Sequence, residues 1–167
     1  MSELPPITSV AERLRDSALE NELSRLLRGV SDEERERFLV ALLRDNRFSA
    51  RMAALSLVRR TVTSKESLRR IFLVGLERKD VSEIGAWLRA IVPRMGINAI
   101  LLTLAGDAVR ADHIVRCWYQ LQPYVKNKNI TNDVRIVEKV QELKDKVRER
   151  YSELSEEEKE ACARYEI

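Results

Sequence analysis

The residues of this chain that could do chemistry gather around a single histidine. His113 lies in the run DAVRADHIVRCW, directly after Asp112 and four residues before Cys117. Residues four apart share one face of a helix, so His113 and Cys117 could reach one metal ion, and His113 is the one imidazole available for general-base catalysis. Two metal ligands without a second pair are a weak signal. We favour a histidine on a helix surface beside a small buried cysteine, and we predict no metal site.

Other patterns typical of catalytic or cofactor sites are missing from the sequence. No HExxH or CxxC motif occurs, and none of the five glycines has the close spacing of a phosphate-binding loop. The glutamates fall mainly at predicted helix starts or on charged helix faces, where they complement the helix dipole. The sequence does not decide whether two carboxylates form an acid–base pair, because such a pair is recognised by its spatial geometry. The sequence predicts a protein that is not an enzyme and that holds no cofactor.

The strongest candidate for a binding site is a block of basic residues in the middle of the chain. Residues 51–100 carry ten Lys or Arg against four Asp or Glu, whereas residues 151–167 carry two against six. Arginine binds phosphate and carboxylate groups through a bidentate fork, so this block suits either a nucleic-acid backbone or an acidic protein segment. Such a block also arises where helices merely present solvated faces. The residues predicted to bind are Arg47, Arg51, Arg60, Arg69 and Arg70.

Two tryptophans, Trp87 and Trp118, could anchor a ligand in a groove or belong to the core. Large aromatic residues at helical spacing are more often core residues, and we predict that role for both.

The elements that must position these residues are predicted to be helices, because every strong apolar periodicity is helical and Leu, Ala, Arg and Glu abound. Five pairs fit the capping-box pattern that marks helix starts: Ser9 with Glu12, Ser31 with Glu34, Thr63 with Glu66, Asp80 with Glu83, and Ser155 with Glu158. The predicted helices cover residues 10–29, 32–44, 47–61, 64–77, 81–94, 97–105, 108–123, 131–152 and 156–165.

The loops between these helices are very short from residue 29 to residue 108, so successive helices should be antiparallel neighbours. This spacing predicts stacked helical hairpins with a loose internal period of roughly thirty to thirty-five residues. The run VSEIGAWLRAIVPRMGINAILLTL, residues 81–104, would form one hairpin with Pro93 and Gly96 at its turn. Its predicted buried residues are Ile84, Trp87, Leu88 and Ile91.

The composition changes near residue 125, where lysine replaces arginine as the main basic residue. Beyond it, a charged helix carries an apolar stripe of less than two heptads, which favours docking on the repeats over a coiled coil. The stripe consists of Ile136, Val140, Leu143 and Val147. We predict a helical-repeat domain over 1–125 and a C-terminal long helix with an acidic capping tail over 126–167. The fold should survive loss of residues 156–167, which carry few apolar anchors.

The run DNRFSARMAALSLV, residues 45–58, resembles the first helix of a HEAT or HEAT-like repeat. An aspartate precedes the helix, an arginine follows, and paired alanines allow close helix approach; Asp45, Arg51, Ala53, Ala54, Leu55 and Leu57 take these places. The resemblance implies a short α-solenoid in which Asp45 and Arg51 bond between neighbouring repeats. The next unit departs from the pattern, because Trp87 stands where the alanine pair would be. The resemblance covers residues 45–123 at most.

We therefore expect an all-α fold, a short α-solenoid of stacked antiparallel helical hairpins with a long C-terminal helix. Such a chain favours a non-catalytic module that mediates protein–protein interaction, with an acidic surface or segment of a protein as its partner. The alternative is a nucleic-acid-binding HEAT-like protein that uses the basic middle region. Some proteins of that kind are alkyl-base glycosylases, and Trp87, Trp118, Asp107 and Asp112 supply the residue types of their cleft without an alignable motif.

The two cysteines have no metal or redox spacing, which favours reduced thiols in the cytoplasm. The start, MSELPPITSV, lacks the basic region and apolar core of a signal peptide. No run approaches the length of about eighteen apolar residues of a membrane span. We expect a cytoplasmic protein with no membrane partner, while its oligomeric state and the identity of its partner lie beyond the sequence.

Overall fold

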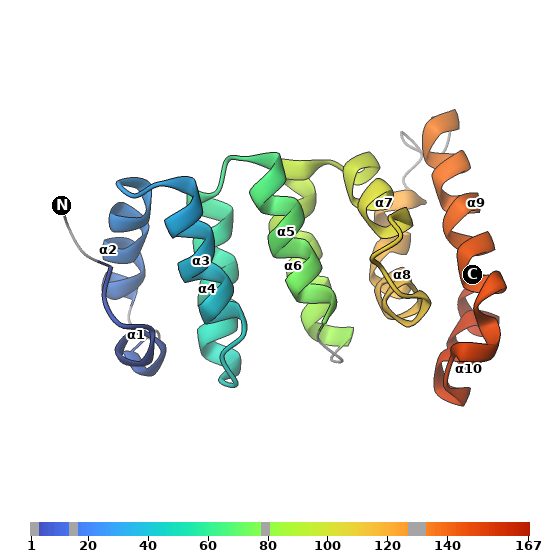
Figure 1. Ribbon diagram of the computed structural model, residues 1–167, viewed down its shortest axis with the longest axis horizontal. Helices are drawn as coiled ribbons and strands as arrows, with labels where there is room; N and C mark the ends of the chain where they lie inside the picture. Colours follow the sequence, from blue (N-terminus) through green and yellow to red (C-terminus); the bar gives the residue numbers. More distant parts are fainter. Residues whose placement is uncertain (1–3, 14–16, 78–80, 127–132) are drawn as a thin grey trace. The chain divides into compact units, whose positions relative to one another are not determined.

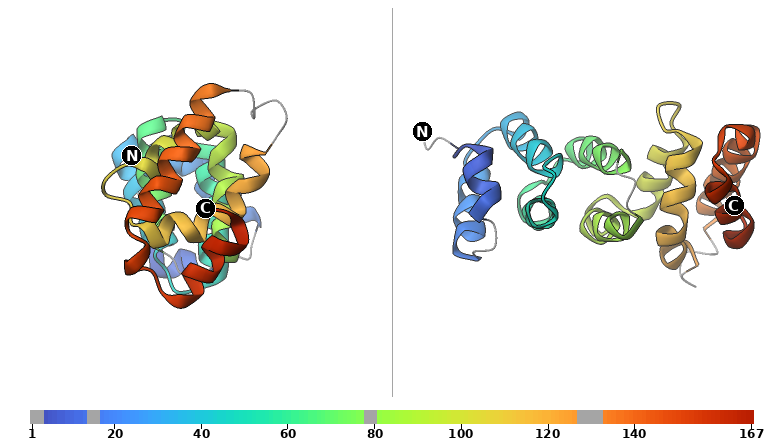
Figure 2. Two further views of the ribbon diagram at one scale, coloured as in Figure 1. Left: turned by 90° about the vertical axis from the view of Figure 1, so that its right-hand side faces the viewer. Right: turned by 90° about the horizontal axis from the view of Figure 1, so that it is seen from below.

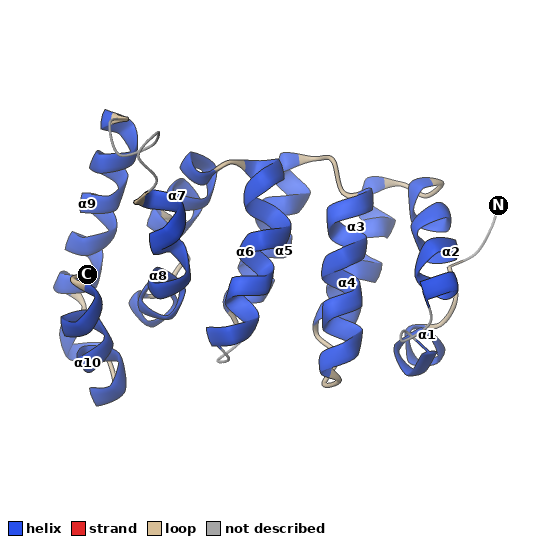
Figure 3. Cartoon of the chain, turned by 180° about the vertical axis from the view of Figure 1, so that it is seen from behind, coloured by secondary structure: helices blue, strands red, loops and turns tan. Residues whose placement is uncertain are grey.

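The computed structural model describes residues 4–13, 17–77, 81–126 and 133–167, and every regular element in these ranges is helical (Figures 1 and 3). The prediction of an all-α fold is confirmed. The helices are α1 (Ile7–Arg13), α2 (Ser17–Arg28), α3 (Asp32–Leu43), α4 (Phe48–Thr61), α5 (Lys65–Leu76), α6 (Val81–Met95), α7 (Ile97–Ala105), α8 (Ala111–Val125), α9 (Val134–Glu149), a short 3-10 helix (Tyr151–Glu153) and α10 (Glu156–Tyr165). In these ranges no single helix is long and apolar enough to cross a membrane; residues 83–95 and 97–105 pass that test only as a bent pair.

Two of the predicted capping boxes mark true helix starts. The hydroxyl of Ser31 accepts a hydrogen bond of 3.2 Å from the backbone N–H of Glu34 at the start of α3. At α10 the box is reciprocal, because Ser155 accepts from the N–H of Glu158 and the Glu158 carboxylate accepts from the N–H of Ser155. Each bond satisfies a backbone donor that the first helical turn leaves without a partner.

Two other predicted boxes are wrong. Ser9 lies inside α1, and its hydroxyl donates to the carbonyl of Pro6 rather than accepting a bond at the helix start. At α5 the cap is Ser64, not Thr63, because the Ser64 hydroxyl accepts from the N–H of Ser67. Both errors shift a helix start by one to three residues and leave the helices themselves in place.

Where the sequence predicts one helix over residues 10–29, the structure has α1, which ends at Arg13, and α2, which begins at Ser17; residues 14–16 lie outside the described residues. The predicted box of Asp80 with Glu83 falls on residue 80, which lies outside the described residues. The other predicted helices match α3 to α10 within a few residues at each end.

The described residues form two compact units, one from those within residues 1–75 and 89–94 and the other from those within residues 76–88 and 95–167. The sequence suggested instead a division after residue 125, which stays a prediction. In the first unit α3 and α4 form an antiparallel hairpin, seen side by side in Figures 1 and 2, and α2 packs against α4. The fully buried side chains of this unit include Leu23, Leu27, Leu39, Leu42, Ala54, Leu57, Val58, Leu68 and Ile71.

The second unit is built around α7, α8 and α9, with α10 packed on α8. Three residues of the predicted stripe on α9, Ile136, Leu143 and Val147, are buried, and α9 packs against α7 and α8. The prediction that this helix docks on its neighbours is thus confirmed. Its long apolar contact explains why so charged a helix is stable in this place.

Both tryptophans belong to the core of the second unit. Trp87 is 1% exposed and Trp118 is 4% exposed, so neither offers its ring to a ligand in a surface groove. The remaining predicted buried residues of α6, including Ile84 and Leu88, are also buried. Among the described residues, the indole N–H of Trp87 finds no hydrogen-bond partner. Gly96, between α6 and α7, takes a positive φ of 86°, a conformation that few other residues adopt.

The C-terminal tail is anchored more firmly than its composition suggested. The indole N–H of Trp118 donates to the backbone carbonyl of Tyr165 at 3.2 Å, and the amide of Gln122 donates to the same carbonyl at 3.3 Å. Cys162 and Ile167 are buried. The expectation that the fold survives loss of residues 156–167 stays a prediction, and these contacts argue that the loss lowers stability.

Replacing Trp87 with alanine should lower the free energy of unfolding by about 3–5 kcal/mol, because a large buried ring leaves a cavity. Replacing Trp87 with phenylalanine should cost much less, since the indole N–H has no partner among the described residues to lose. Urea denaturation followed by circular dichroism measures both changes. Equal and small losses would show that the ring is not a core residue.

Deleting residues 156–167 should lower the free energy of unfolding by about 3 kcal/mol or more, because it removes the cover of Trp118 and the carbonyl that its indole N–H binds. The control is Lys159→Ala, which removes an ion pair with Glu156 on the same helix and a cation–π contact with Tyr151 but leaves the cover of Trp118 in place. Thermal melts of both variants test this. If the deletion variant is as stable as the control, residues 156–167 contribute little to the stability of the fold.

Candidate functional site

The segment around His113 forms a structural ion network at the start of α8. Asp112 accepts two hydrogen bonds from Arg110, at 2.9 and 3.3 Å, and one of 2.6 Å from Arg116. The nearest His113 nitrogen lies 4.0 Å from the same carboxylate. Burial lowers the pKa of His113, because desolvation penalises the imidazolium. Asp112 is thus held by two guanidinium groups rather than positioned to orient a catalytic imidazole.

Cys117 lies one turn after His113 and is fully buried. Burial raises the pKa of its thiol, so the thiolate that would act as nucleophile or metal ligand is disfavoured. Among the described residues, no group of three or more His, Cys, Asp or Glu side chains is arranged to hold a metal ion. The packing supports the interpretation of Cys117 as a small core residue.

Arg47 and Arg51, from the predicted binding cluster, both act at the connection between α3 and α4. Arg47 pairs with the carboxylate of Asp45 at 2.9 and 3.1 Å, and lies 3.7 Å from Glu12. The Asp45 carboxylate has a lowered pKa, mainly because Arg47 donates to it. Arg51 is buried and donates to the carbonyls of Asp45 and Asn46 at 2.9 and 2.8 Å. These two bonds of Arg51 lie within one hairpin.

Arg35 of α3 makes the same kind of contact as Arg51 of α4. The sequence analysis did not select Arg35. Each is the fourth residue of its helix, α3 and α4 respectively. Arg35 is buried and donates to the carbonyls of Leu27 and Val30 at 2.6 and 3.0 Å, at the end of α2. Leu27 lies in the last turn of α2, where carbonyls have no partner within the helix, whereas Val30, Asp45 and Asn46 lie in the connections that follow α2 and α3. Both arginines thereby satisfy backbone carbonyls at or just after the end of the preceding helix. The shared position within the helix is a signal that a search for periodic arginines would have found.

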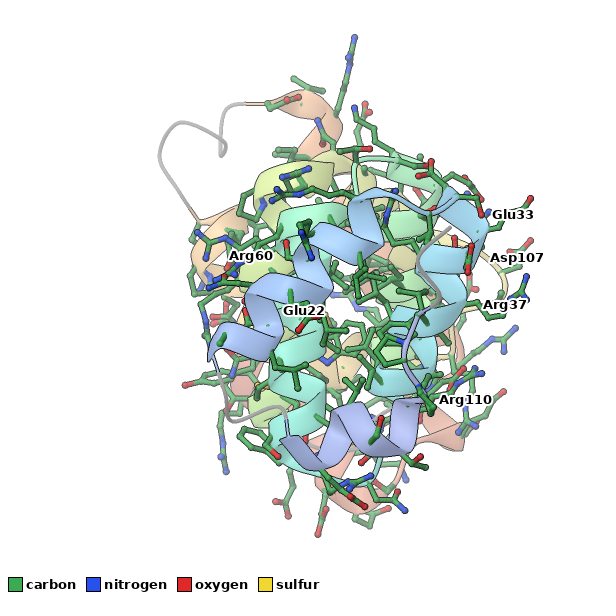
Figure 4. The ribbon with its side chains drawn as sticks, turned by 90° about the vertical axis from the view of Figure 1, so that its left-hand side faces the viewer. Glu22, Glu33, Arg37, Arg60, Asp107 and Arg110 are labelled. Carbon is green, nitrogen blue, oxygen red and sulfur yellow. The ribbon has the colours of Figure 1, made fainter. Side chains whose placement is uncertain are left out.

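Arg60 and Arg70 join helices that are distant in sequence. Arg60, seen beside α2 in Figure 4, donates to Asn21 at 3.0 Å and lies 3.4 Å from the carboxylate of Glu20. Arg70 of α5 forms a bidentate pair with Glu36 of α3, at 2.7 and 2.8 Å. The hydrogen bond from Arg70 is the main cause of a lowered pKa at Glu36.

Arg94, which the sequence analysis did not select, makes the same kind of connection. Its guanidinium donates to the carbonyls of Arg59 and Val62 at 3.1 and 3.0 Å, at the end of α4. The bond of Arg60 spans 39 residues of sequence and that of Arg70 spans 34. The two bonds of Arg94 span 35 and 32 residues. We call these three contacts the inter-helix arginine bonds.

Arg69 is the one member of the predicted cluster that makes no hydrogen bond or ion pair with the described residues. The structure thus engages the other four arginines, Arg47, Arg51, Arg60 and Arg70, in separate contacts instead of presenting all five as one free patch. Two other exposed cations nearby, Arg37 and Lys65, are equally without a partner in the described ranges.

A groove of about 810 Å³ lies between α3 and α5 in the first unit. Its lining consists of Glu33, Glu36, Arg37, Val40, Ala41, Arg44 and Arg70. Glu33 and Arg37 project from the same side of α3 (Figure 4), and Val40 and Ala41 contribute apolar surface. The groove therefore combines an accessible guanidinium with apolar side chains and two carboxylates.

Compared with known proteins, the chain matches no family model, no curated protein and no solved structure. The HEAT-like resemblance of residues 45–58 stays a prediction.

Replacing Glu36 with glutamine should weaken the dependence of stability on pH in acid. The pKa of Glu36 lies below its ordinary value of 4.5 in the folded state. Its carboxylate therefore stabilises the fold above that value, and the contribution is lost as the pH falls through the lowered pKa. The wild type should lose more stability than Glu36→Gln between about pH 5 and pH 3.

Urea denaturation over this pH range provides the measurement. The matched control is Glu22→Gln on α2, an exposed carboxylate that pairs with none of the described residues (Figure 4). The same pH dependence in the wild type and in Glu36→Gln would show that the pair with Arg70 does not form.

Proposed function

We propose that this protein is a non-catalytic helical-repeat module that mediates protein–protein interaction. The observation that carries the proposal is the spacing of the inter-helix arginine bonds. Arg70 joins α5 to α3, Arg60 joins α4 to α2, and Arg94 joins α6 to α4. Each arginine thus bonds to the helix two places earlier, which is the contact that stacked two-helix repeats require. The bonds span 32 to 39 residues, close to the period of roughly thirty to thirty-five that the sequence predicts.

A stack of hairpins favours binding because its repeats contact only their neighbours and leave extended faces free of core residues. The groove between α3 and α5 is the place on the first unit that we assign to a partner. Arg37 is exposed at this groove without a partner among the described residues, and Val40 and Ala41 provide apolar contact. An acidic protein segment with apolar side chains would match both features.

The charges of this groove favour a protein segment over nucleic acid. Glu33 and Glu36 line the groove together with the arginines, and the Arg70 guanidinium is already bonded to the Glu36 carboxylate. A duplex carries one phosphate charge about every 1.7 Å of its axis and would meet these carboxylates. A protein segment can place a carboxylate at Arg37 and apolar groups elsewhere.

The test compares two labelled probes by fluorescence anisotropy: an amphipathic peptide of alternating glutamate and leucine residues, and a random-sequence DNA duplex. The peptide should bind more tightly, and Arg37→Glu should weaken it about tenfold by reversing the accessible charge. The duplex should bind no more tightly than the non-specific range of about 10⁻⁴–10⁻⁶ M at physiological salt. Arg37 is the residue to change because it makes no hydrogen bond or ion pair with the described residues, so its replacement should not disturb the fold.

The control is Arg28→Glu on α2, an exposed reversal outside the groove, which should leave peptide binding nearly unchanged. Tight duplex binding that falls steeply with salt would replace the proposal with the nucleic-acid alternative. Equal weakening by both reversals would remove the groove as the binding place.

A further inference from the structure

The second unit holds a groove of about 680 Å³ between α8 and α10. Val115 and Tyr119 line it from α8, and Ala161 and Tyr165 line it from α10. All of its lining residues belong to the second unit, so it is separate from the α3–α5 groove of the proposed function.

One wall of this groove is an aromatic pair held in a fixed place. The rings of Tyr119 and Tyr165 lie 4.9 Å apart between centroids and are tilted by 41°. The backbone of Tyr165 is fixed by two hydrogen bonds to its carbonyl, from the buried indole of Trp118 and from Gln122. Tyr119 nevertheless remains 49% exposed. Because the Tyr119 ring already packs against Tyr165, it can contact a ligand with a smaller loss of side-chain entropy than an isolated surface ring.

The charges that remain free in the groove are mainly negative. Among the lining residues, Arg110 and Arg116 are both bonded to Asp112. The carboxylates without an ion pair among the described residues are Glu153, Glu157 and Glu160, and the cation without one is Arg164. The groove thus pairs an exposed tyrosine face with a surplus of unpaired carboxylates.

We propose that the α8–α10 groove binds a lysine- or arginine-rich segment of a partner protein. A basic side chain can lay its alkyl stem and charged head across the ring of Tyr119, where the ring quadrupole attracts the cation. The neighbouring basic residues of the segment are then attracted by Glu157 and Glu160 on α10. This surface has the opposite charge preference from the α3–α5 groove, so the two units would select different partner segments.

The probe that tests this is labelled octalysine, titrated with the protein at ionic strengths up to about 0.15 M and followed by fluorescence anisotropy. Tyr119→Ala should weaken binding about 2- to 5-fold, the contribution of an exposed cation–π contact. Tyr119→Phe keeps the ring and should keep the affinity. The double variant Glu157→Gln with Glu160→Gln should weaken binding about fivefold and reduce its salt dependence.

The matched control removes two exposed carboxylates of α3 instead, Glu33→Gln with Glu34→Gln, and should leave octalysine binding nearly unchanged. Thermal melts establish that each variant is folded. No binding of octalysine by the wild type, equal weakening by the two double variants, or an unchanged affinity in Tyr119→Ala would each overturn the proposal. The acidic peptide of the previous section tests the other groove separately, and Tyr119→Ala should not affect it.

Discussion

The helices in the described residues are at best marginally stable by themselves in water. The α-helices contain between 7 and 16 residues, close to or below the length at which isolated helices are marginal. Each must therefore bury one face against its neighbours, and the fold is the set of contacts that achieves this. Leucine, isoleucine and alanine provide those faces in both units. Burying one large aliphatic side chain contributes about 1.5–3 kcal/mol, which makes packing the main source of stability.

The ion pairs of the arginines contribute much less to the free energy of unfolding than this apolar packing does. An exposed ion pair contributes about 0.2–1 kcal/mol, so even the bidentate pair of Arg70 with Glu36 adds little to the total. Its value is geometric, because two parallel hydrogen bonds fix the spacing and orientation of α3 and α5 where apolar contact alone would allow sliding. Arg35 and Arg51 are buried and satisfy backbone carbonyls at or just after helix ends, and leaving these carbonyls without a partner would cost free energy.

Sequence reasoning predicted the helices and the buried stripes because both depend on local spacing. Ile136, Leu143 and Val147 recur at helical intervals, and Trp87 falls on the apolar side of its helix. Helix starts were less certain, because Thr63 and Ser64 are neighbouring capping residues and only one can cap. The candidate site was hardest to predict. The partner of Arg70 lies 34 residues away, so a basic run in the sequence gives no sign that its charges are already paired.

The division of the chain into two units also separates its fluorophores. Both tryptophans and all four tyrosines fall in residues 76–88 and 95–167, and the first unit contains none of them. Intrinsic fluorescence therefore reports on the second unit alone, whereas far-ultraviolet circular dichroism reports on the helices of both. If the units unfold as one cooperative body, the two signals change at the same denaturant concentration; if they unfold separately, the two midpoints differ. Comparing the two signals in the unlabelled protein thus shows whether the unfolding of one unit is energetically coupled to that of the other.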